Sequence, residues 1–180
     1  IVLVGPASRA DLWARHAADS AQLLALAGHW RVWLDLGSGG GFPGLVVAIM
    51  LAGSEGHVHL VESDGRKAAF LRTVIREVGA AASVHNQRAE ALAEMQAPVL
   101  ADVQVISARA LAPLPELLEL IAPFFNSSTI ALLHKGAGWQ DELARAEQCW
   151  MIDVEAHPSQ THDAARILHL RHLARRGEAL

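Results

Sequence analysis

The stretch Asp35–Gly44, DLGSGGGFPG, decides the fold class of this chain. The apolar run Arg31–Leu36 leads into it and the helix-compatible run Leu45–Leu51 follows it, so the glycines lie between a strand and a helix. Glycines permit positive φ angles and a close approach of a ligand to the backbone. The next strand-like run, His57–Val61, ends at Glu62, whose carboxylate can accept hydrogen bonds from ribose hydroxyls. Together these features predict a nucleoside-binding strand–helix–strand unit.

Further along the chain, short β-type runs alternate with helical stretches. Residues Asp64–Val78 repeat apolar positions at helical spacing, and Gly79 stands where a helix commonly ends in a left-handed glycine. The other predicted helices are 90–95, 113–121 and 140–148, and the other predicted strands are 82–85, 103–106, 129–133, 151–156 and 166–173. This alternation predicts an α/β fold, with a mostly parallel sheet and helices on both faces. Because no helix separates the last two strands, we expect an antiparallel pair at one edge. Ligands of such folds bind beyond the carboxyl ends of the strands.

Composition narrows the class of protein. The 180 residues suit a single domain, and 52% hydrophobic with 19% charged residues exclude a disordered chain. The longest apolar run, Gly44–Gly53, is too short to cross a bilayer, so we expect no membrane partner. The lone cysteine, Cys149, excludes a disulfide framework and predicts a reducing, cytoplasmic location. We expect the natural N-terminus to lie upstream of Ile1, and a monomer is the default expectation.

The glycine spacing leaves two cofactors open. Gly39, Gly41 and Gly44 match the G-x-G-x-x-G spacing of dinucleotide-binding folds, whereas a frame that begins at Gly37 has Phe42 in the third position. The acidic Asp35 beside the loop suits a cationic ligand better than a pyrophosphate. S-adenosylmethionine carries a sulfonium and an ammonium group and no phosphate, so the loop favours S-adenosylmethionine over NAD. An NAD-dependent oxidoreductase remains the alternative, although the chain has no tyrosine for a Tyr-x-x-x-Lys catalytic pair.

Several motifs, in this order, resemble the RsmG (GidB) family of bacterial 16S rRNA guanine-N7 methyltransferases. They are RHAADS at 15–20, the glycine stretch, VESDGRKAAFLR at 61–72, QRAE at 87–90, ARALAPL at 108–114 and HKG at 134–136. The resemblance implies a class I, Rossmann-like, S-adenosylmethionine-dependent methyltransferase with a seven-stranded sheet. It also implies that residues 1–30 are a shortened helical segment and that 31–180 form the core. The small ribosomal subunit and its 16S rRNA are the implied partners.

The resemblance and the fold together assign candidate site residues. The expected cofactor-binding residues are Asp35, Gly37, Gly39, Phe42, Glu62, Ala89, Glu90 and Arg109. Arg88 and Lys135 are expected to face the RNA, and Arg109 to lie against both cofactor and target base. Family context places Arg15, His16 and Asp19 near the entrance on the cofactor side.

Guanine N7 is a lone-pair nucleophile that carries no proton, so no general base is expected. Arg88, Arg109 and Lys135 would then act by positioning the substrate. The segment Ser107–Ala110 lacks the N/D-P-P-Y/F motif typical of enzymes that methylate exocyclic amines. A non-catalytic RNA-binding or ribosome-assembly factor on the same fold is the second alternative.

Ten histidines raise the question of a metal site. His57 and His59 alternate along one predicted strand, and His169 and His172 lie on another. No pair is accompanied in the sequence by the set of carboxylates or thiolates that a metal site needs. We therefore expect no metal.

Overall fold

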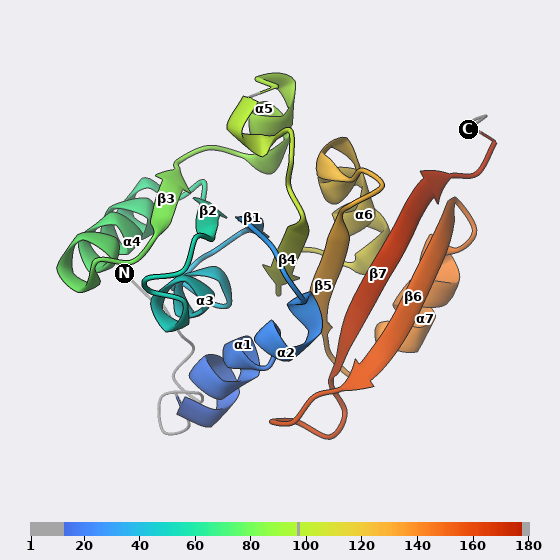
Figure 1. Cartoon of the computed structure of the whole chain (residues 1–180). Helices are drawn as coiled ribbons and strands as arrows, with labels where there is room; N and C mark the ends of the chain where they lie inside the picture. Colours follow the sequence, from blue (N-terminus) through green and yellow to red (C-terminus); the bar gives the residue numbers. More distant parts are fainter. Residues whose placement is uncertain (1–12, 97, 178–180) are drawn as a thin grey trace.

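A seven-stranded sheet runs through the molecule in the order β3-β2-β1-β4-β5-β7-β6 (Figure 1). The computed structural model describes residues 13–96 and 98–177. The strands are β1 Val32–Leu36, β2 His57–Val61, β3 Ala82–His85, β4 Val105–Arg109, β5 Ile130–Lys135, β6 Trp150–Pro158 and β7 Arg166–Arg175. The first five strands pair in parallel with one another, whereas β7 is antiparallel to both β5 and β6. The predicted sheet with its antiparallel edge pair is confirmed.

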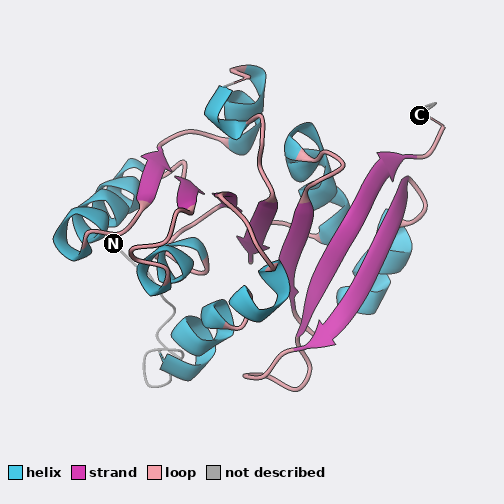
Figure 2. Ribbon diagram, viewed as in Figure 1, coloured by secondary structure: helices cyan, strands magenta, loops and turns pink. Residues whose placement is uncertain are grey.

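Helices connect the parallel strands. The α-helices are α1 Asp19–Ala21, α2 Leu24–Ala27, α3 Gly44–Met50, α4 Gly65–Val78, α5 Ala89–Glu94, α6 Leu114–Ile121 and α7 Trp139–Ala146. A π-helical stretch, Trp13–Ala18, precedes α1, and 3-10 turns cover Pro98–Leu100 and Ala122–Phe124. Figure 2 shows these helices arranged around the sheet. Within the described ranges, no helix is both long and apolar enough to cross a membrane.

The sheet separates two hydrophobic clusters, because alternate side chains of each strand point to opposite faces. On β1, Leu34 and Leu36 pack in the cluster that includes α5, α6 and α7. Trp33, the residue before Leu34, packs in the cluster that includes α2, α3 and α4. The prediction that helices cover both faces is therefore confirmed.

Local signals set the ends of α4 as predicted. The Asp64 side chain accepts hydrogen bonds from the backbone N–H groups of Arg66 and Lys67, at 2.8 and 3.2 Å. Gly79 ends the helix in the left-handed region, with φ of 67°. Such a cap satisfies backbone groups that the helix itself leaves unpaired.

The strand predicted over 103–106 lies further along the chain, at Val105–Arg109. Its apolar alternation ends at Ile106, yet the ladder to β5 continues until Arg109 stands opposite His134. Backbone pairing, which the apolar pattern does not record, therefore carries Arg109 to the carboxyl edge of the sheet.

Candidate functional site

A first cavity, of about 440 Å³, opens beyond the carboxyl ends of β1, β2 and β4. Short segments after these strands and before α5 form most of its wall. It collects all of the predicted cofactor residues except one: Gly37, Gly39, Phe42, Glu62, Ala89, Glu90 and Arg109. A concave site of this size is typical of small-molecule binding. The structure thus places these residues together, and their contact with a cofactor stays a prediction.

The glycine loop is shaped by backbone conformations that side chains rarely adopt. Gly37 and Gly39 have φ angles of 68° and 54°. A Cβ at Gly37 would lie 2.7 Å from a methyl carbon of Leu111, which also lines the cavity. Only a residue without a side chain keeps both this conformation and this approach.

Glu62 supports the loop from the end of β2. Its Oε2 accepts a hydrogen bond from the Gly39 N–H at 2.8 Å, and its Oε1 accepts one from the Asp64 N–H at 2.7 Å. A carboxylate offers about four acceptor positions, so two remain for a ligand. One side chain can thus hold the loop and accept from hydroxyls in the cavity.

Asp35 corrects one prediction, because its side chain does not reach the first cavity. It is completely buried and lies under α3, where a Cβ at Gly44 would come within 2.5 Å of the Asp35 Cβ. Its Oδ1 accepts a hydrogen bond of 2.6 Å from the Ser107 hydroxyl, which in turn accepts one from the Trp33 indole. Burial raises the pKa of Asp35 to about 6. Strand alternation turns the side chain into the sheet–helix interface, so its role is structural.

A second cavity, of about 560 Å³, adjoins the first beyond β4 and β5. The two share one wall, formed by Arg109, Ala110 and Leu111. Ala110 has a φ of 52°, a strained value for a residue with a side chain. The chain thus turns sharply at the end of β4, between the two cavities.

Asp19 joins the N-terminal helices to the second cavity. Its Oδ2 lies 3.2 Å from the Arg109 guanidinium and 3.6 Å from the His134 ring. Its Oδ1 accepts hydrogen bonds from Gln22, Ser159 and Thr161. One buried carboxylate therefore links α1, the ends of β4 and β5, and the loop between β6 and β7.

His134 and Arg109 complete this network. His134 Nε2 is 2.9 Å from the Asp19 carbonyl oxygen, and burial lowers the pKa of His134 below its ordinary value. Arg109 also lies 2.7 Å from His16 Nδ1, and the His16 ring packs 4.9 Å from the Phe42 ring. The expectation that His16 and Asp19 lie near the cavities agrees with these contacts. The Arg15 side chain lies outside the described residues.

Lys135 lines the second cavity, but its ammonium group is paired within the protein, and its contact with RNA stays a prediction. Only 8% of the residue is exposed. Its Nζ donates to the Ala112 carbonyl at 2.7 Å and pairs with Glu142 at 2.9 Å. Glu142 also accepts from the Leu114 N–H at 2.7 Å. Lys135 therefore ties β5 and α7 to the loop after β4. Arg88, by contrast, is exposed beside the first cavity, and its contact with RNA also stays a prediction.

The sequence patterns did not indicate Leu111, Glu142 or Thr161, which line the cavities. Leu111 stands inside the ARALAPL motif, so that motif is the signal that marks the shared wall. Glu142 and Thr161 carry no such signal, because ordinary helix and loop residues surround them in the sequence.

Comparison with known proteins identifies the family of this chain. The family model described as GidB, rRNA small subunit methyltransferase G, matches residues 1–170. The chain belongs to the GidB family.

Curated relatives in this family cover most of the chain. A protein of Parvibaculum lavamentivorans named Ribosomal RNA small subunit methyltransferase G is 50% identical over 175 residues, which are 96% of this chain and 76% of that protein. One of the same name from Rhodospirillum centenum is 50% identical over 178 residues, covering 98% and 78% of the two chains. The GidB family predicted from the motifs is confirmed.

Solved structures with the same fold come from distant proteins. Aeropyrum pernix fibrillarin, in complex with natively bound S-adenosyl-L-methionine, superposes with a TM-score of 0.66 at 15% identity, covering 87% of this chain and 75% of that one. A SAM-dependent methyltransferase from Aquifex aeolicus gives 0.64 at 12% identity, covering 89% and 92%. The predicted Rossmann-like methyltransferase fold of this GidB member is confirmed, and membership of a methyltransferase family decides against the NAD-dependent oxidoreductase.

Proposed function

We propose that this chain transfers a methyl group from S-adenosylmethionine to N7 of a guanine in the 16S rRNA of the small ribosomal subunit. The observation that carries the proposal is the pair of adjoining cavities that share the Arg109–Leu111 wall. A group transfer needs a donor and an acceptor held on either side of one reacting atom. Relatives named small subunit rRNA methyltransferases support the nucleic-acid substrate.

The residues of the first cavity fit S-adenosylmethionine. The glycine loop leaves its backbone open to a ligand, because a Cβ at Gly37 would close the gap to Leu111. Glu62 offers acceptor positions for ribose hydroxyls, and Ala89 and Glu90 lie where an adenine would be flanked. When bound, the cofactor supplies an electrophilic methyl group on a sulfonium. The chain itself supplies binding and orientation.

The second cavity would hold the target guanine. N7 carries no proton, so the chain does not have to remove one and its work is alignment. Arg109 can donate to the O6 edge of the base, because Asp19 and His16 hold its guanidinium at the shared wall. His134 stays neutral at pH 7, since burial lowers its pKa, and adds no positive charge beside the N7 that becomes cationic.

Binding of the rRNA would use local contacts, since the net charge of −4 provides no overall attraction to phosphates. Arg88 is an exposed cation at the rim of the first cavity. An assembled subunit would add protein contacts. In this proposal residues 1–180 work as one methyltransferase domain and as a monomer in the cytoplasm, and the transfer uses no metal.

The test is to incubate the chain with labelled S-adenosylmethionine and small subunits that lack the modification. Chemical cleavage at N7-methylguanine then maps the label, with the Gly37→Leu variant as the inactive control. Label at one guanine is the expected result. Label at another atom or base would contradict the proposed target. Subunit binding without label, in a chain that binds S-adenosylhomocysteine, would favour the non-catalytic assembly factor.

A further inference from the structure

Three side chains with metal-ligating atoms lie on the open face of the edge pair β6–β7, and none of them lines either cavity. Glu155 on β6 is paired directly with His169 on β7. His157 follows Glu155 by two residues, so its side chain points to the same face. In Figure 1, α7 lies behind these strands, and no helix of the described chain crosses their front.

The three side chains converge on one point. One donor atom from each of Glu155, His157 and His169 lies within 4.8 Å of the other two. Glu155 Oε2 and His157 Nε2 are 3.7 Å apart, and the two imidazole rings are 5.7 Å apart. Zinc–nitrogen bonds of about 2.0–2.1 Å place tetrahedral ligands about 3.3 Å from one another. Small side-chain rotations therefore suffice to form such a site.

The imidazoles have unused hydrogen-bonding capacity. Nε2 of His157 and Nε2 of His169 are both buried, and neither has a hydrogen-bond partner among the described residues. His169 is 7% exposed, and a buried polar atom without a partner costs free energy.

One cation competes for the same carboxylate. Arg171 donates a hydrogen bond of 2.8 Å to Glu155 Oε2 and lies 3.5 Å from His169 Nδ1. Both partners of the ion pair are about half exposed, with 45% and 53% of their side chains accessible. Exposed pairs of this kind contribute little stability. A metal ion can therefore displace the guanidinium, and Arg171 should weaken metal binding without preventing it.

We propose that Glu155, His157 and His169 bind one divalent zinc ion, with water completing the coordination. Two imidazoles and a carboxylate are ligands that zinc accepts. The role is structural: Pro158 ends β6, and the next residue, Ser159, donates to Asp19 in the second cavity. Zinc at this position would hold the end of β6 to β7 and steady the loop that joins them. This inference does not depend on the proposed methyl transfer.

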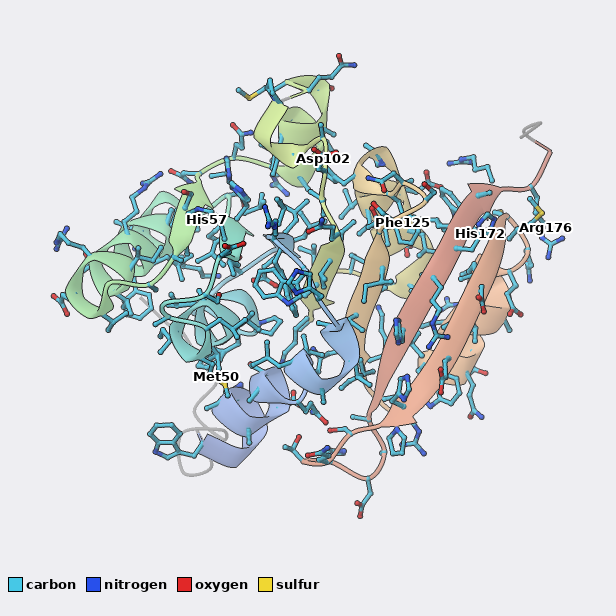
Figure 3. The ribbon with its side chains drawn as sticks, in the orientation of Figure 1. Met50, His57, Asp102, Phe125, His172 and Arg176 are labelled. Atoms are coloured by element: carbon cyan, nitrogen blue, oxygen red, sulfur yellow. The ribbon has the colours of Figure 1, made fainter. Side chains whose placement is uncertain are left out.

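The experiment titrates zinc into untagged, chelator-stripped protein by calorimetry, with cobalt absorption as a second readout of coordination. We expect one ion per chain. Replacing either histidine, His157→Ala or His169→Ala, should weaken zinc binding roughly tenfold or more. Arg171→Gln should tighten it severalfold. The matched control is His57→Ala. His57 lies on β2, on the other side of the sheet from β6 and β7 (Figure 3), so this variant should keep the zinc affinity of the wild type.

Circular dichroism verifies that each variant is folded. Glu155→Gln tests the site at its exposed ligand, where a substitution disturbs no buried packing, and it should also weaken zinc binding. Failure to bind one ion per chain would overturn the proposal. Equal zinc affinity in the wild type, His157→Ala and His169→Ala would do the same. Loss of binding in His57→Ala alone would assign the ion to the histidines of β2 and would also overturn it.

Discussion

The two cavities of this methyltransferase domain are built by different means. The first is shaped by backbone, from segments that each follow a strand, with Gly37 and Gly39 in left-handed conformations. The second is held by side chains that are distant in sequence: Asp19 contacts His134 across 115 positions and Ser159 across 140. The first cavity should therefore lose cofactor binding when a side chain is added to its backbone. The second cavity should lose stability when a charge is removed from its side chains.

The largest effect should follow from adding a side chain to the first cavity. Gly37→Leu forces a left-handed φ on a bulky residue and drives its Cβ into Leu111, so S-adenosylmethionine binding should fall at least roughly a thousandfold. Calorimetry with S-adenosylhomocysteine measures this loss. Gly138→Ala is the matched control, since a Cβ there meets nothing within 4 Å. Unchanged affinity in Gly37→Leu would remove the loop from the cofactor site.

The next effect concerns Asp35, which is buried under α3 and does not line the first cavity. The pKa of Asp35 is raised from 3.8 to about 6, so the folded state holds the proton more tightly than the unfolded state. The protonated Asp35 therefore contributes up to about 3 kcal/mol to the free energy of unfolding. This contribution is complete below pH 3.8 and is lost as the pH rises through 6. Asp35→Asn keeps an acceptor for Ser107 and cannot ionise.

Urea unfolding of the wild type and Asp35→Asn between pH 4 and 8 measures this contribution. The variant should match the wild type near pH 4 and exceed its stability above pH 7. S-adenosylhomocysteine affinity should hardly change, because Asp35 does not line the cavity. A constant stability difference across the pH range would show that Asp35 does not titrate there.

Removing charge from the second cavity tests the other half of the comparison. Asp19→Asn leaves Arg109 and His134 without their carboxylate, so the free energy of unfolding should fall by about 2 kcal/mol and rRNA methylation should drop. Cofactor affinity should change far less than in Gly37→Leu. Asp163→Asn, an exposed aspartate of the β6–β7 loop, is the matched control. Equal stability of the two variants would contradict a structural role for Asp19.

The smallest effect concerns the ion pair between Lys135 and Glu142 beside the second cavity. Lys135→Met leaves Glu142 and the Ala112 carbonyl without their partner, which should cost about 1 kcal/mol of stability. A double-mutant cycle with Glu142→Gln isolates the pair. If Lys135→Met instead keeps full stability and loses affinity for the small subunit, Lys135 faces the RNA after all.

Short-range patterns predicted much of the fold. The glycine stretch, the alternation of strands and helices, and the cap residues Asp64 and Gly79 each act within a few residues, so the sequence displays them directly. Strand ends were less predictable, because pairing with β5 extends β4 to Arg109 beyond its apolar pattern. The first cavity was foreseen except for Asp35, whose direction depends on which face α3 covers.

The sequence by itself therefore determined the α/β class, the family and the backbone-built cavity, because local conformation and order along the chain suffice for these. Only the tertiary structure decided that Lys135 is paired with Glu142 and that Asp19 joins four distant segments. It also brought Glu155, His157 and His169 together, where the spacing of histidines had predicted no metal site. The physical reason is the same in each case: strand pairing and chain crossover set which distant side chains meet, and no local pattern records that.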